Sequence, residues 1–172
     1  MKASRGKVIV SKKVGPCGGA GGSAKDMDIT GITRIVKVSV RHGWAIDALT
    51  VLFLRNGKEE STDRWGGGGG SLSEFTLQPS EYITSVKGHM GPFFGYFVVR
   101  SLKFETNFGA YGPYGKEEGT PFELPAINGK VIGFYGRSAG LLDTLGVYVN
   151  MEMDPVERLI TGFKQFKTEV YE

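Results

Sequence analysis

The sequence predicts an all-β domain assembled from three similar units. Glycine supplies 27 of the 172 residues without a collagen-like period, and Val, Ile, Phe and Tyr are frequent, which is typical of strands joined by tight turns. Three glycine-rich segments recur about every 50 residues, and such a repeat indicates three small sheets around one core. The segments are Gly15–Ser23, Trp65–Ser71 and Gly112–Thr120. In each, an anchoring side chain precedes a glycine, a short gap, a second glycine and a hydroxyl residue.

The strands of the first unit follow from the pattern of apolar residues. Residues 7–14 can form an opening strand ahead of the first glycine-rich loop. A strand is expected over residues 32–41, because valine alternates with polar side chains over residues 36–41, the period-two pattern of a half-buried strand. A further strand is expected over residues 48–54, and the Asn56-Gly57 pair after it predicts a tight hairpin turn.

The second and third units repeat this plan. Strands are expected over residues 75–77, 82–87, 96–106, 122–124, 131–135 and 142–150. The repeat also extends beyond the glycines, because Gly43–Phe53 aligns with Ala139–Val149 and places Asp47 opposite Asp143. The middle unit has Arg100 at this position. The first and third units therefore share an acidic residue, and the middle unit has a basic residue in its place.

The ends of the chain depart from the repeat. Residues 1–7 are rich in basic side chains and are expected to form a flexible leader, residues 8–150 the domain, and residues 151–172 an extension. Asp154, Pro155 and Glu157 are residues typical of a helix start. Apolar residues on one face then predict a helix over residues 154–168. This helix could cap the domain, or it could contact a second copy or another partner.

Composition excludes several classes of function. The formal net charge of +3 is too small to indicate a nucleic-acid partner. One cysteine, Cys17, excludes an intramolecular disulfide framework, and two histidines with one cysteine make no convincing zinc site. We expect no metal and no cofactor. The absence of a signal-peptide pattern and of a long apolar segment predicts a cytoplasmic or nucleocytoplasmic protein without membrane insertion.

Two enzyme interpretations are considered and rejected. The segment Gly136–Gly140 matches the Gly-x-Ser-x-Gly elbow of hydrolases, but a strand pattern follows Ser138 where that elbow needs a helix. Both histidines also precede Ser138, whereas the elbow needs a later one. Asp47 and Asp143 could act as the carboxylate pair of a glycosidase, yet equivalent members of separate repeats should lie far apart. The sequence therefore predicts a protein that is not an enzyme.

The glycines and aspartates together suggest a site for a small polar molecule. A glycine-rich turn presents bare backbone groups to a ligand, because no Cβ blocks its approach. An aspartate beside such a turn accepts hydroxyl protons while the turn amides donate to the same hydroxyls. The vicinal diols of a sugar need this mixture of donors and acceptors. The alternative is that these are only tight turns, in which Asp47 and Asp143 bond to their own backbone.

Several motifs in the expected order resemble the jacalin-related lectins, in particular their mannose-specific plant branch. The likeness covers roughly residues 8–150 and rests on the glycine-rich start Gly15–Ser23, the Trp65–Gly70 run, Tyr111–Phe122 and Gly133–Tyr148. The resemblance implies a β-prism of three four-stranded Greek-key sheets and metal-independent binding of mannose or glucose. It also implies a nucleocytoplasmic location, dimers or tetramers with a homodimer favoured, and a role in plant defence or stress.

The resemblance further implies two carbohydrate sites. The primary site would consist of Gly22, Gly140, Leu141 and Asp143, and the second of Gly70, Trp44, Ala45 and Asp47. The third glycine-rich turn meets Arg100 and is expected to bind no sugar.

Two further points qualify the primary site. Ala139 replaces the first glycine of the primary motif, which costs little if its φ is negative and more if it is positive. The segment 87–94 could form a wall of this site.

An alternative function is a lectin-fold scaffold with a weakened sugar site that acts through its C-terminal helix.

Overall fold

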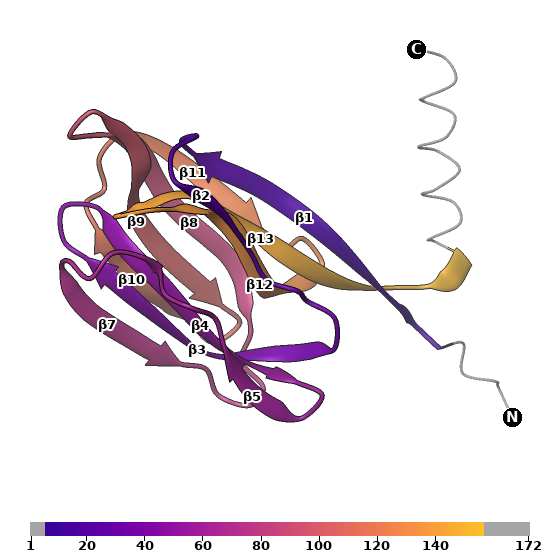
Figure 1. Ribbon diagram of the computed structural model, residues 1–172. Helices are drawn as coiled ribbons and strands as arrows, with labels where there is room; N and C mark the ends of the chain where they lie inside the picture. The colour runs from indigo at the N-terminus through magenta and orange to yellow at the C-terminus, as the bar shows by residue number, and fades with distance from the viewer. Residues whose placement is uncertain (1–5, 157–172) are drawn as a thin grey trace, which may run out of the picture.

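The computed structural model describes residues 6–156, and its regular elements are thirteen β-strands (Figure 1), so the predicted all-β class is confirmed. The strands are β1 (Val8–Gly18), β2 (Ser23–Asp26), β3 (Ile32–His42), β4 (Ile46–Arg55), β5 (Lys58–Ser61), β6 (Trp65–Gly66), β7 (Ser71–Thr76), β8 (Ile83–Phe93), β9 (Tyr96–Thr106), β10 (Ala110–Gly115), β11 (Thr120–Pro125), β12 (Gly129–Ser138) and β13 (Leu142–Met153).

Strand pairing groups these strands into three equivalent antiparallel sets. The strand orders are β1-β13-β12-β2, β6-β4-β3-β7 and β10-β9-β8-β11, with β5 as an additional neighbour of β4. In each set a central hairpin is flanked by two strands that carry a glycine-rich loop between them. The first and third sets join into one eight-stranded sheet through a single pairing of Val131 with Ile83. The pairing thus reproduces the predicted threefold repeat.

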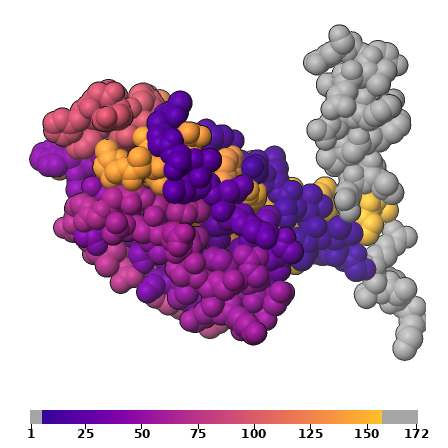
Figure 2. Space-filling model, viewed as in Figure 1, coloured from indigo at the N-terminus to yellow at the C-terminus, as the bar shows by residue number. Residues whose placement is uncertain are grey.

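The first set is closed by the two ends of the chain. Its flanking strands β1 and β2 come from the N-terminal part, whereas its central hairpin β12–β13 comes from the C-terminal part. Strand β1 pairs with β13 from Val8 opposite Met153 to Gly18 opposite Thr144. The far end of this pair projects beyond the body of the molecule (Figures 1 and 2). The last strand therefore continues past residue 150, where the domain was expected to end.

The predicted C-terminal helix is not among the regular elements of residues 6–156. Only its start lies in the described part of the chain, where Asp154 Oδ1 accepts a hydrogen bond of 2.8 Å from the amide of Val156. The remainder of the prediction, like most of the basic leader, falls on residues outside the described part.

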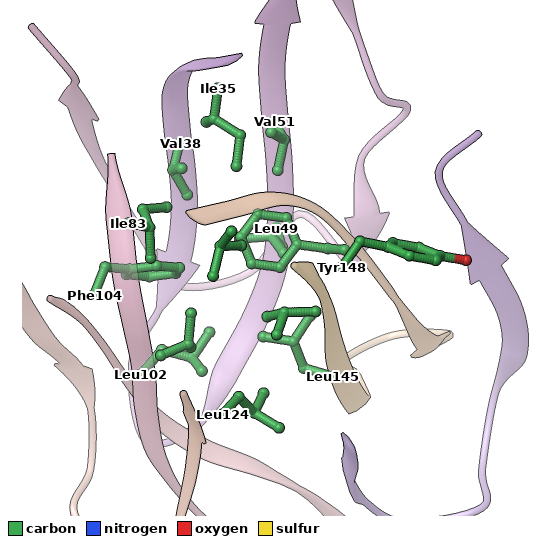
Figure 3. Close-up of a cluster of buried hydrophobic side chains, with 14 of the residues drawn as sticks. Ile35, Val38, Leu49, Val51, Ile83, Leu102, Phe104, Leu124, Leu145 and Tyr148 are labelled. Carbon is green, nitrogen blue, oxygen red and sulfur yellow. The ribbon is translucent and has the colours of Figure 1, made fainter. Parts of the chain in front are cut away.

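The three sets share one apolar core. Side chains from all of them point toward one another, including Leu49 from β4, Phe104 from β9 and Leu145 from β13, each fully buried (Figure 3). The Phe104 ring lies between neighbouring sets, with its centroid 5.1 Å from that of Phe75 and 6.3 Å from that of Phe134. This shared core fixes the three hairpins relative to one another and so positions their turns.

Truncation of Phe104 tests this shared core. We expect Phe104→Ala to lower the free energy of unfolding by about 3–5 kcal/mol, because it removes a buried ring and leaves a cavity between the sets. The 86% exposed Phe94 offers a matched control, and Phe94→Ala should change that free energy by no more than about 0.5 kcal/mol. Urea denaturation measures both values. Equal effects of the two substitutions would contradict the shared core.

Candidate functional site

Each glycine-rich loop lies directly on the backbone of a central hairpin. The glycine that opens the loop has positive φ and faces the carbonyl oxygen at the position aligned with the aspartates. The pairs are Gly18 with Asp143, Gly66 with Asp47 and Gly115 with Arg100, and an added Cβ would lie 2.2, 2.0 and 2.3 Å from these oxygen atoms. A side chain at any of the three would displace the loop, so only glycine allows this approach.

A second glycine in the first two loops meets the aspartate side chain. Gly22 and Gly70 have nearly equal φ angles of 70° and 69°. A Cβ on Gly22 would lie 2.7 Å from Asp143 Oδ2, and one on Gly70 would lie 2.6 Å from Asp47 Oδ2. The structure therefore brings each predicted loop glycine together with its predicted aspartate, at two of the three equivalent places.

An arginine supports each of these loops. Arg137 donates to the carbonyl oxygens of Gly21 and Gly22 at 3.0 and 2.7 Å. Arg41 does the same for Gly69 and Gly70 at 3.0 and 3.4 Å. Neither arginine was among the predicted site residues. The alignment of the repeats could have identified them, because each arginine lies two residues before one of the aligned segments that begin at Gly43 and Ala139.

The carboxyl group of Asp143 is the most unusual polar group of the site. Its residue is only 4% exposed, and Oδ2 has no hydrogen-bond partner within residues 6–156. Burial raises the pKa of this carboxyl above its ordinary value, while Arg137 and the amides of Ala139 and Asp143 oppose the rise. A buried acceptor without a partner is costly. The free oxygen is thus suited to accept a hydrogen bond from a ligand.

A cavity of about 280 Å³ lies in front of this carboxyl group. All four residues predicted for the primary site, Gly22, Gly140, Leu141 and Asp143, line it. Gly21 and Ala139 complete the lining from the same unit, and Tyr96 and Val98 add a wall from β9. The primary set is therefore assembled as one concave surface.

The wall differs from the predicted segment 87–94. Most of that segment is strand, since β8 runs from Ile83 to Phe93, and the cavity is lined instead from the far side of the β8–β9 turn. Lys87 and His89 line a separate hollow of about 480 Å³. The prediction selected the correct hairpin but not its lining residues.

The replacement of glycine by Ala139 does not strain the turn. Ala139 is not among the residues of positive φ, and its amide donates to Leu141 O at 3.1 Å as that of Gly43 donates to Ala45 O at 3.0 Å. At the equivalent Gly43, a Cβ would have its nearest contact at 3.9 Å, an ordinary van der Waals distance. The methyl group is therefore accommodated.

The second predicted set is also brought together, but its residues differ in exposure. Gly70 and Asp47 face each other beside Gly43, and Asp47 is half-buried with a carboxyl pKa that burial raises and Arg41 and His42 lower. Trp44 is 64% exposed, whereas the side chain of Ala45 is buried at 1%. Ala45 can therefore contribute only its backbone to a ligand.

The serine of the Gly136–Gly140 motif is closed to solvent. Ser138 is 2% exposed, and its hydroxyl is buried without a partner in the described part of the chain. Within residues 6–156, no three metal-ligating side chains gather, and no helix is long and apolar enough to span a membrane.

Comparison with known proteins gives the family. Residues 14–148 match the jacalin-like lectin domain. The chain belongs to this family. Jacalin-related lectin 19 of Arabidopsis thaliana is 40% identical over 141 residues, which are 80% of this chain and 79% of that protein. The predicted family is thus confirmed, and its members compared here are lectins, which bind carbohydrate and are not enzymes.

Two solved structures show the same fold. A mannose-binding jacalin-related lectin from Ananas comosus superposes with a TM-score of 0.78 at 39% identity, covering 83% of this chain and 98% of that one. Malaysian banana lectin gives a TM-score of 0.76 at 40% identity, covering 81% and 98%. The three strand sets of this jacalin-like lectin domain thus have counterparts of the β-prism type.

The raised pKa of Asp143 makes a prediction about stability. A group whose folded-state pKa lies above its unfolded value contributes stability below the unfolded pKa and loses it as pH rises through the folded one. Ionised Asp143 therefore opposes folding at neutral pH. We expect Asp143→Asn, of nearly equal size, to raise the free energy of unfolding near pH 7, and this gain to shrink as the pH falls toward about 4.

Urea denaturation at several pH values measures this difference. The exposed Asp63 provides the matched control, and Asp63→Asn should show no comparable trend. A gain for Asp143→Asn that grows on acidification would contradict the raised pKa of this buried carboxyl group.

Proposed function

We propose that this chain is a metal-independent lectin for mannose- or glucose-type sugars, with its primary site at Asp143. The observation that carries the proposal is the buried Asp143 Oδ2, which has no hydrogen-bond partner within residues 6–156 and lies at the side of a cavity lined by Gly22, Gly140 and Leu141. The lectin from Ananas comosus, of similar fold and 39% identity, is described as mannose-binding. The same chemistry is therefore a reasonable assignment for this chain.

The chemistry of a pyranose fits this arrangement. Two adjacent hydroxyl groups can donate to the two oxygens of one carboxylate, and charged acceptors form the stronger hydrogen bonds. The amides of Gly22, Gly140 and Leu141 would donate to the same hydroxyl oxygens. Val98 and Tyr96 offer an apolar wall for the face of the ring. Because the acceptor is a side chain held by backbone, no metal is required.

We propose a second site at Asp47. Its glycine loop, supporting arginine and turn repeat those of Asp143, as the paired distances to Gly22 and Gly70 show. Each small site would bind weakly, and a homodimer carrying several sites would gain avidity for branched glycans. In the middle unit, Arg100 forms an ion pair of 3.1 Å with Glu118 at the corresponding place, and we propose that this unit binds no sugar.

The alternative of a scaffold with a degenerate sugar site has less support. It depended on Ala139 and on the predicted C-terminal helix. Ala139 keeps the turn geometry of its glycine counterpart, and the helix falls almost wholly outside the described residues.

Titration with methyl α-mannoside tests the proposal. We expect wild type to bind two sugars per chain with dissociation constants of about 1 mM, as weak monosaccharide sites do. Asp143→Ala and Asp47→Ala should each remove one site, because each deletes one charged acceptor. Calorimetry gives the stoichiometry, and amide shifts of Gly22 and Gly70 assign the lost site.

The controls use the same measurement. Asp63→Ala should retain both sites, and methyl α-galactoside should bind more weakly because its 4-hydroxyl points to the other side of the ring. Absence of any response by wild type at tens of millimolar mannoside would overturn the lectin assignment.

A further inference from the structure

Arg100 occupies the place that an aspartate holds in the other two units. The pairing of Gly115 with Ser101 matches those of Gly18 with Thr144 and Gly66 with Ala48. Arg100 is 7% exposed, so its charged group is buried at the point where a sugar acceptor would otherwise lie. A buried guanidinium is costly unless its donors are satisfied.

The guanidinium donates from three nitrogen atoms to three different segments. Arg100 Nε donates to Trp44 O at 3.1 Å, and Nη1 donates to Pro92 O at 3.0 Å. Nη2 pairs with Glu118 Oε2 at 3.1 Å. Its carbon centre also lies 5.0 Å from the centroid of the Phe93 ring. One side chain thus joins the β3–β4 turn, the end of β8 and the β10–β11 connection.

Two of these partners belong to hairpins that border the proposed sugar sites. Trp44 lies in the turn that builds the second site. Pro92 and Phe93 end β8, and the paired strand β9 supplies Tyr96 and Val98 to the cavity of the primary site. The β8–β9 hairpin extends further than its counterparts, because β9 begins at Tyr96, four residues before Arg100, whereas β4 and β13 begin one residue before Asp47 and Asp143.

The β8–β9 hairpin also lies against the first glycine-rich loop. A Cβ on Gly19 would be 2.0 Å from Phe97 O, so these two backbones are in direct contact. A displacement of the β8–β9 hairpin would therefore move both the wall of the primary cavity and the loop that contains Gly22. Arg100 is the buried charged group that ties this hairpin to the rest of the molecule.

We propose that Arg100 is a positioning residue that sets the geometry of both sugar sites, an inference that rests on the proposed lectin function. Its planar fork of donors can satisfy two carbonyl oxygens and a carboxylate at once, which a lysine ammonium on a flexible stem does less well. Glu118, whose side chain is 60% exposed, holds the fork in this orientation from the solvent side.

The test compares Arg100→Met with a matched substitution elsewhere. Arg55 also binds one carboxylate, Glu60, and two carbonyl oxygens, those of Thr30 and Asp28, beside an aromatic ring. It lies at the opposite end of β4 from Asp47. Arg55→Met thus reproduces the loss of a bonded arginine without touching the turns. Glu118→Ala, at an exposed residue, is a second variant that retains the fold if Arg100→Met does not.

We expect Arg100→Met to weaken methyl α-mannoside binding at both sites by about tenfold, the effect of one hydrogen bond to a charged group. Glu118→Ala should weaken it in the same direction, and Arg55→Met should leave both affinities unchanged. Without sugar, the amide signals of Tyr96 and the indole signal of Trp44 should shift in Arg100→Met and Glu118→Ala but not in Arg55→Met.

The outcomes separate the two proposals. Unchanged signals of Tyr96 and Trp44 in the Arg100 and Glu118 variants would overturn the positioning role, as would wild-type affinity at both sites. If wild type itself binds no sugar, the lectin assignment fails, and the sugar-free signals still decide whether Arg100 holds the two turns.

Discussion

Direct contact between glycine backbone and hairpin backbone is the constraint on which the remaining structure depends. At three equivalent places a loop glycine lies where a Cβ would come within 2.3 Å or less of a carbonyl oxygen. The following residue in each loop, Gly19, Gly67 or Lys116, then donates its amide to that same oxygen at 2.9–3.0 Å. These three contacts join each loop to its hairpin through backbone atoms alone, and in the first two loops Arg137 and Arg41 add side-chain support.

This scaffold supports opposite charges at equivalent positions. Asp143 and Asp47 remain acceptors beside glycines that leave room for a sugar, and each costs stability because burial disfavours the ionised form. Arg100 instead fills the equivalent space with its own side chain and its partner Glu118. Asp143 and Asp47 thus lower stability but leave a carboxylate accessible to a ligand, whereas Arg100 fills the equivalent place and links neighbouring segments. The backbone geometry is the same at all three places, and the side chain at this one position determines whether the place can bind a ligand or holds the hairpins together.

Much of the fold and of each site could be predicted from the sequence because the decisive contacts lie within a repeat. The spacing of Gly18, Gly22 and their counterparts marked the loops, and the alignment of Asp47 with Asp143 marked their partners. Contacts between different repeats produce no such pattern in the sequence and could not be predicted from it. Tyr96 and Val98 reach the first site from another unit, and the bond from Arg100 to Trp44 O joins a side chain to a backbone group. The pairing of the N-terminal strands β1 and β2 with the C-terminal hairpin β12–β13 could not be predicted for the same reason.

We propose that the buried carboxylate of Asp143 is the acceptor for a sugar held by the first glycine-rich loop. A crystal structure of the chain with methyl α-mannoside tests this most directly. We expect a pyranose in the cavity with a hydroxyl oxygen about 2.5–3.0 Å from Asp143 Oδ2 and with the amide of Gly22 within hydrogen-bond distance of the sugar. A sugar bound at another surface, with Asp143 Oδ2 still without a partner, would contradict it.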